Sequence, residues 1–167
     1  MKDSYKKILM AAIQNKKENK KFFEWLRKKN PKDLDVLTNS FHDKAFESID
    51  CLNCGNCCTT TGPLLLNKDI ERLARHFKQR PSEFSEKHLK TDSDGDYIFK
   101  AMPCPFLKAD LYCSVYESRP NACREYPHTQ QRQIYQKLNI TYLNSMICPA
   151  VALVTEELKR HFAHQPR

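Results

Sequence analysis

The alternation of apolar and polar side chains predicts helices at both ends of the chain. Over residues 4–29, apolar side chains recur at the three- and four-residue spacing of one helix face. Lysine pairs at 16–17 and 20–21 interrupt this face, so the segment forms either one helix or two shorter ones. Pro149 opens a last helix, because proline suits a first helical turn. The apolar side of that helix consists of Val151, Val154, Leu158 and Phe162.

A second helix is predicted over residues 31–48, directly before the first cysteine. Asn30 provides an N-cap, and Pro31 fits the first turn, where its missing N–H would have no partner. The inner face of this helix carries Leu34, Leu37, Phe41 and Ala45.

Shorter elements are predicted in the middle of the chain. A helix capped by Asn67 is ended by Pro81, and a further helical turn covers residues 82–88. The Asp-Gly pair within residues 92–96 predicts the turn of a β-hairpin that ends in Tyr97–Phe99. The apolar face of the helix after Asn67 consists of Ile70, Leu73, Ala74 and Phe77.

The acidic turn at residues 92–96 also resembles part of a calcium loop. An EF-hand needs glycine at its sixth position and a glutamate at its twelfth. Gly95 comes too early for this pattern, and Pro103 stands where the glutamate would be. The plain hairpin turn is therefore the preferred interpretation.

Composition and charge describe an ordinary globular chain with a basic beginning. Of its 167 residues, 40% are hydrophobic and 29% are charged, and its three glycines cannot form a phosphate-binding loop. The net charge of +8 resides in residues 1–32, which hold eleven Lys/Arg against three acidic residues. We expect a basic helical segment over residues 1–47 and a cysteine domain with the last helix over residues 48–167.

Eight cysteines carry the main chemical signal. Four lie within residues 51–58 as C-x2-C-x2-C-C, a spacing that lets a turn direct sulfurs to one ion. A single cysteine such as Cys148 could be a small buried hydrophobe, and disulfides are a second alternative. No signal peptide or membrane-spanning run is apparent, so we expect a cytoplasmic protein with reduced thiols. The predicted metal ligands are Cys51, Cys54, Cys57, Cys58, Cys104, Cys113, Cys123 and Cys148.

Zinc and iron both suit these ligands. Four cysteines close a structural zinc site. The first three cysteines of the run also reproduce the C-x2-C-x2-C spacing of bacterial ferredoxins, whose last ligand precedes proline. Both Cys104-Pro105 and Cys148-Pro149 offer that last ligand. The expected cofactor is therefore zinc or iron, including an iron–sulfur cluster, in one or two thiolate centres.

These cysteine blocks resemble the YkgJ-type cysteine-cluster family. The resemblance rests on the C-x2-C-x2-C-C run, on Cys104-Pro-Phe-Leu, and on the segment from Cys113 to Pro127. It covers about residues 48–150 and leaves out the basic N-terminal segment. It implies a zinc- or iron-chelating domain.

Other residues in these blocks have expected roles around the metal. Arg119 and Arg124 are predicted to donate hydrogen bonds around the thiolates and offset their charge, with plain surface arginines as the alternative. Tyr116 and Tyr126 are expected to pack over the site. His128 is either a ligand or, preferably, a solvated loop histidine.

The sequence contains no nucleophile–base motif, so it does not decide whether the protein is an enzyme. Glu117 and Glu125 could act as acid or base, although ion pairs with arginine are the preferred interpretation. We expect a small, mainly α-helical, metal-stabilised domain with a short β-hairpin and long ligand loops. Its function is metal chelation; an iron–sulfur redox or catalytic module acting with a modifying enzyme is an alternative. Another alternative is a zinc-stabilised module whose residues 1–32 bind nucleic acid or a protein partner.

Overall fold

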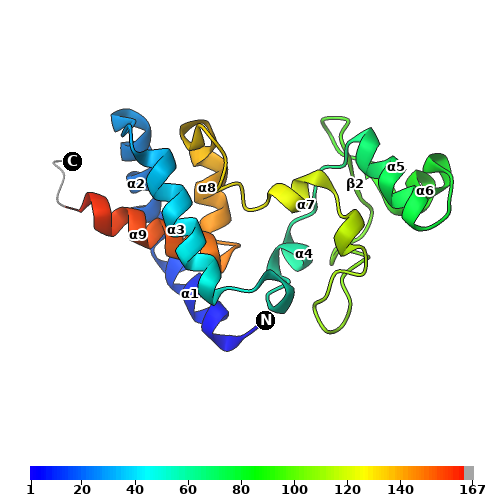
Figure 1. Ribbon diagram of the computed structural model, residues 1–167, viewed down its shortest axis with the longest axis horizontal. Helices are drawn as coiled ribbons and strands as arrows, with labels where there is room; N and C mark the ends of the chain where they lie inside the picture. Colours follow the sequence, from blue (N-terminus) through cyan, green and yellow to red (C-terminus); the bar gives the residue numbers. More distant parts are fainter. Residues whose placement is uncertain (164–167) are drawn as a thin grey trace. The chain divides into compact units, whose positions relative to one another are not determined.

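The computed structural model describes residues 1–163 and shows a mainly helical chain with one β-hairpin (Figure 1). This confirms the predicted fold class. The expected cysteine domain runs on to residues 164–167, which lie outside the described residues. The helices are α1 (Asp3–Gln14), α2 (Lys16–Lys29), α3 (Leu34–Ser48), α4 (Asn56–Thr60), α5 (Asn67–His76), α6 (Pro81–His88), α7 (Asn121–Glu125), α8 (Leu138–Ser145) and α9 (Pro149–Phe162). The strands are β1 (Leu89–Thr91) and β2 (Tyr97–Phe99), and the short 3-10 helices are η1 (Cys51–Asn53), η2 (Tyr116–Ser118) and η3 (Ile134–Lys137).

The chain folds as two compact units. The first unit comprises residues 1–54 and the segment from Pro127 onward, and the second comprises Gly55–Tyr126. Helix α9 packs against α1 and α3 within the first unit. The expected boundary after residue 47, which separated a basic segment from the cysteine-containing region, stays a prediction.

Helix α9 forms the core of the first unit. Its residues Ala150, Val151, Val154 and Leu158 are at most 2% exposed, and the helix contacts α1, α3 and α8. Burying such a side chain contributes roughly 1.5–3 kcal/mol. The predicted start at Pro149 and the predicted apolar side of this helix are both confirmed.

The apolar face predicted over residues 4–29 belongs to two helices, which is the second of the two alternatives left open by the sequence. Asn15 separates α1 from α2. The buried face of α2 includes Asn19, which is 1% exposed and accepts a 3.1 Å hydrogen bond from the Lys159 ammonium. The lysine pairs of α2 stay exposed because Asn19, Phe23 and Leu26 form its inward face.

Asn30 ends α2 instead of capping α3, so the N-cap prediction is wrong. Its φ of 45° is left-handed, and its N–H donates to the Leu26 carbonyl at 2.8 Å. Asparagine tolerates this conformation and closes helices for that reason. Helix α3 therefore begins later than predicted, after a turn in which Leu34 N–H donates to the Pro31 carbonyl at 3.2 Å.

Helix α5 also begins differently from the prediction. Leu66 is its N-cap, and Asn67 is its first helical residue. The carboxylate of Asp69 accepts the Leu66 N–H at 3.0 Å. The helix ends at His76, and Pro81 starts α6 instead of ending α5.

The segment 134–145 forms η3 and α8, which no sequence pattern had predicted. The buried side of α8 is largely polar, and its members are Leu138, Thr141, Asn144 and Ser145. Thr141 Oγ1 donates to the Lys137 carbonyl at 2.8 Å, and Asn144 Nδ2 donates to the Pro127 carbonyl at 3.3 Å. These bonds offset the cost of burying polar atoms.

The second unit has its own apolar core, built by α5, α6 and the hairpin. Leu73 and Phe84 are 0% exposed. The Phe106 ring lies 5.4 Å from the Phe99 ring in an edge-to-face arrangement, which aromatic pairs favour. The hairpin is as predicted, with Leu89 opposite Phe99 and an Asp92 carboxylate that holds the turn.

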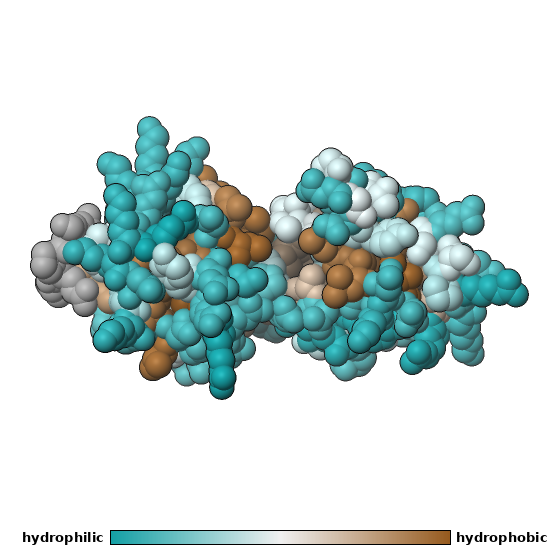
Figure 2. Space-filling model, turned by 90° about the horizontal axis from the view of Figure 1, so that it is seen from above, coloured by the Kyte–Doolittle hydropathy of each residue, from teal (hydrophilic) through white to brown (hydrophobic). Residues whose placement is uncertain are grey.

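Hydrophilic side chains cover most of each unit in the view of Figure 2, and apolar side chains reach the surface in smaller areas. Val36, Leu66 and Met10 are among the exposed apolar residues. Within residues 1–163, no single helix is long and apolar enough to cross a membrane. The pair formed by 134–145 and 149–162 reaches that length and hydropathy only together, with a bend of 119°.

Candidate metal centre

The C-x2-C-x2-C-C run folds around Gly55. Gly55 has a left-handed φ of 61° and precedes α4, which carries Cys57 and Cys58. A Cβ at this position would lie 3.2 Å from Leu111 Cδ2. Conformation and space therefore both favour glycine between the second and third cysteines.

A backbone hydrogen bond joins the end of this run to the next cysteine. The Cys104 N–H donates to the Cys58 carbonyl at 2.7 Å. A bridge between Leu107 and Cys113 then folds the chain back, so that Cys104 and Cys113 flank one short loop. Both side chains are half-buried and pack against the apolar core of the second unit.

The last cysteine of the second unit lies on the short helix α7. The Cys123 N–H donates to the Pro120 carbonyl at 3.0 Å, which places the thiol in the first turn of that helix. Burial, together with the smaller effects of the charges of Cys58, Cys104 and Cys113, raises the pKa of Cys123 to about 12. The four thiols therefore lie within electrostatic reach of one another.

Burial also raises the pKa of the Cys104 and Cys113 thiols, whereas the pKa of Cys58 is lowered. Burial and the charges of Cys58 and Cys113 raise the pKa of Cys104 to about 11, against hydrogen bonds from the backbone of Phe106 and Leu107. Burial also raises the pKa of Cys113. Cys58 differs, because a hydrogen bond with Cys57 lowers its pKa to about 7 against the effect of burial.

Three further cysteines, Cys51, Cys54 and Cys148, belong to the first unit. Cys148 is 7% exposed and precedes α9. Burial, together with smaller effects of the charges of Cys51 and Cys54, raises its pKa to about 12. The sulfur of Cys54 also lies 3.9 Å from the thioether sulfur of Met1.

The donor chemistry of these groups fits zinc or iron. Sulfur ligands favour soft metals, and a cation would stabilise thiolates whose pKa is raised mainly by burial and further by neighbouring thiolates. All eight cysteines are free of disulfides. Within residues 1–163, no three His, Cys, Asp or Glu side chains already stand in a coordinating arrangement.

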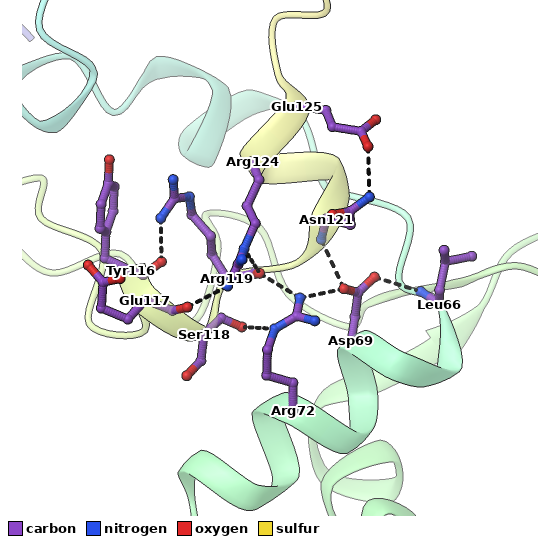
Figure 3. A network of polar contacts seen from close by, with 10 residues as sticks. All are labelled: Leu66, Asp69, Arg72, Tyr116, Glu117, Ser118, Arg119, Asn121, Arg124 and Glu125. Carbon is purple, nitrogen blue, oxygen red and sulfur yellow. Dashed lines mark hydrogen bonds and ion pairs between the residues drawn. The ribbon is translucent and has the colours of Figure 1, made fainter.

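A polar network holds the segment between Cys113 and Cys123 (Figure 3). Asp69, on α5, accepts the Asn121 N–H at 2.9 Å and pairs with Arg72 at 2.5 Å. Arg72 in turn donates to the carbonyls of Ser118 at 3.2 Å and Arg119 at 2.8 Å. Sequence reasoning missed Asp69 and Arg72. In the sequence, an acidic residue in the first turn of a helix indicates only that it caps that helix.

The two arginines near Cys123 occupy different places in this network. Arg119 lies over the Tyr116 ring at 3.8 Å, and its charge lowers the pKa of Cys113 and Cys123 against the larger effect of burial. Arg124 donates to the carbonyls of Arg119 at 3.3 Å and Glu117 at 2.5 Å. Arg124 therefore contacts the loop through backbone carbonyls, whereas Arg119 stacks on Tyr116.

The remaining candidate residues lie on the same loop or just beyond it. Glu125 accepts a 2.7 Å hydrogen bond from the Asn121 side chain, as Figure 3 shows, whereas the Glu117 carbonyl accepts from Arg124. Tyr126 is half-buried at the end of the second unit. His128 belongs to the first unit, where its Nδ1 lies 3.3 Å from Gln131 Nε2.

The basic segment contributes structure as well as charge. Its lysine pairs at 16–17 and 20–21 are exposed, and Glu18 pairs with Lys159 of α9 at 2.9 Å. Phe23 is 3% exposed, and Trp25 packs against Phe162 with ring centres 5.4 Å apart. Of the aromatic residues near these lysines, Phe23 therefore belongs to the core of the first unit, whereas Phe22 and Trp25 are half-buried.

The eight cysteines fall within the part of the chain that a known family of cysteine-rich domains matches. Residues 50–148 match the CxxCxxCC family, described as a "putative zinc- or iron-chelating domain". The match spans more than half of the chain and includes all eight cysteines, so the chain belongs to this family. Comparisons with curated proteins and with solved structures found no significant match.

Proposed function

We propose that this protein binds zinc or iron through a four-thiolate centre in its second unit. The ligands are Cys58, Cys104, Cys113 and Cys123. The observation that carries the proposal is the 2.7 Å bond from Cys104 N–H to the Cys58 carbonyl, which joins the cysteine run to the later ligand loop. Cys58 is also an electrostatic neighbour of all three other thiols.

A bound cation stabilises this arrangement of four cysteines. Four thiolates close to one another repel, two of them (Cys104 and Cys113) pack against an apolar core, and four cysteines are a complete ligand set for structural zinc. Arg119 lies within electrostatic reach of two of them and offsets part of their charge. We therefore also propose that Arg119 offsets the charge of the thiolates and that Arg124 holds the ligand loop in place.

An iron–sulfur centre is the second candidate function, and the first unit supports it. Cys148 precedes Pro149, as the last ligand does in bacterial ferredoxins, and it is the electrostatic neighbour of Cys51 and Cys54. Cys104 also precedes a proline, but its thiol neighbours are Cys58 and Cys113. Within the first unit, this supports Cys148 as the partner of Cys51 and Cys54.

The metal itself is tested on protein purified without oxygen. Zinc that a chelator removes from a colourless protein supports a structural or metal-handling role. A brown protein with absorbance near about 400 nm that disappears on oxidation supports iron–sulfur chemistry. A metal-free protein whose thiols all react with a thiol reagent would contradict both candidates.

A further inference from the structure

We infer that Asp69 is a positioning residue for the four-thiolate centre, an inference that rests on the proposed function. Asp69 has no place among the ligands. It fixes the segment between Cys113 and Cys123 to α5, and this attachment sets how firmly the centre retains its metal.

The contacts of Asp69 are buried and converge from three directions. Its side chain is 2% exposed. One oxygen accepts the Leu66 N–H at 3.0 Å, and the other accepts the Asn121 N–H at 2.9 Å and the Arg72 guanidinium at 2.5 Å. A carboxylate with three donors at such a site is held in one orientation.

Arg72 extends the same attachment along the ligand segment. Its guanidinium reaches the carbonyls of Ser118 and Arg119 while it pairs with Asp69 (Figure 3). Residues 118, 119 and 121 are thereby tied to α5, just before Cys123. The position of that ligand follows from contacts on a helix that contains no cysteine.

Helix α7 needs this attachment because it is short. It spans only Asn121–Glu125, and helices of this length are unstable on their own in water. The carboxylate of Asp69 satisfies the N–H at its first residue. Without that contact, α7 can move and carry Cys123 away from the other three thiols.

The test compares Asp69→Asn with Asp92→Asn. Asp92 is a matched control, because its carboxylate also accepts two backbone N–H groups in the second unit, but in the hairpin turn. Each variant is loaded with zinc, and transfer of zinc to a colorimetric chelator is timed. We expect zinc release from Asp69→Asn to be roughly 10- to 100-fold faster than from wild type, the range typical for groups that orient ligands. Asp92→Asn should release zinc at the wild-type rate.

A second readout separates positioning from general stability. Bound Co²⁺ reports the symmetry of its ligands through its visible absorption bands. Asp69→Asn should change these bands, whereas a carboxylate that only stabilises the fold would leave them unchanged. Wild-type bands together with wild-type zinc release in Asp69→Asn would overturn the inference and leave the proposed function intact. Failure of the wild-type protein to bind either metal would instead remove the proposed function.

A second pair of variants applies if Asp69→Asn does not fold. Asn121→Pro deletes the N–H that Asp69 accepts, and proline is tolerated in a first helical turn. Asn121→Ala keeps this N–H and removes only the side-chain bond to Glu125. Faster zinc release from Asn121→Pro than from Asn121→Ala supports the inference, and equal rates contradict it.

Discussion

Cys104 donates its backbone N–H to the carbonyl oxygen of Cys58 at 2.7 Å. The bond joins the last residue of the C-x2-C-x2-C-C run to the first cysteine of the later ligand loop. This contact supports the proposal that Cys58 shares a centre with Cys104, Cys113 and Cys123 in the second unit. Cys51 and Cys54 instead have Cys148 as their electrostatic neighbour in the first unit.

Paired serine substitutions test this grouping. Cys58→Ser should lower the metal content, because it removes one ligand of the second unit's centre. Cys58→Ser combined with Cys123→Ser should lose no more metal than Cys58→Ser alone, since both residues serve the same centre. Cys58→Ser combined with Cys148→Ser should lose more. Elemental analysis of anaerobically prepared variants measures this, and an unchanged metal content in Cys58→Ser would contradict the grouping.

Replacement of Gly55 should disturb both the fold and the metal. Gly55→Ala places a Cβ on a left-handed residue and 3.2 Å from Leu111 Cδ2. We expect the free energy of unfolding to fall by about 1–2 kcal/mol, as measured by urea titration. Gly62→Ala is the control, because the nearest atom to its Cβ is Met102 Sδ at 3.6 Å, an ordinary contact. Equal losses in the two variants would show that the Gly55 conformation does not matter.

Most of the helical framework could be predicted from the sequence, because its helices have apolar faces. Helix α9 and the hairpin follow directly from the pattern of their residues. Helix α8 could not be predicted, because Thr141, Asn144 and Ser145 fill much of its buried side. Asn30 was misplaced because asparagine serves both as an N-cap and as a left-handed helix end, and local sequence does not choose between them.

The sequence predicts which residues are candidate ligands, but it does not predict how these ligands divide into groups. Spacing identified the eight cysteines as candidates, whereas their division depends on backbone contacts between distant segments. The role of Asp69 could not be predicted from the sequence either. Its local role as an acidic residue in the first turn of α5 is ordinary, and its bond to Asn121 appears only in the folded chain.

Removal of metal should loosen the ligand segments while the first unit's core stays folded. Metal binding contributes folding energy where ligand loops lack an apolar core of their own. After chelation, the amides of Cys104, Ser114 and Cys123 should exchange hydrogen faster, although each has a backbone partner in the structure. Amides in the middle of α9, near Val154, should keep their protection. Unchanged hydrogen exchange at the amides of Cys104, Ser114 and Cys123 would show that the metal does not hold these ligand segments in place.

His42 should make stability depend on pH. Burial lowers its pKa from 6.5, and its Nδ1 lies 2.6 Å from the Thr129 hydroxyl. Because the unfolded histidine binds a proton more readily, the stability that neutral His42 contributes is present above pH 6.5 and is lost as the pH falls through the folded-state pKa. Urea unfolding at several pH values should show this loss in wild type, and His42→Gln should reduce it. An equal pH dependence in both proteins would assign the effect to other groups, such as His88, whose pKa burial also lowers.

The most direct test of the central claim is the metal content of the full chain, purified without oxygen and without a metal-binding tag. Elemental analysis should find at least one zinc or iron ion per chain, and a thiol reagent should find correspondingly few reactive cysteines until the metal is removed. Substantially less than one ion per chain, with all eight cysteines reactive, would contradict the claim that these thiols form a metal centre.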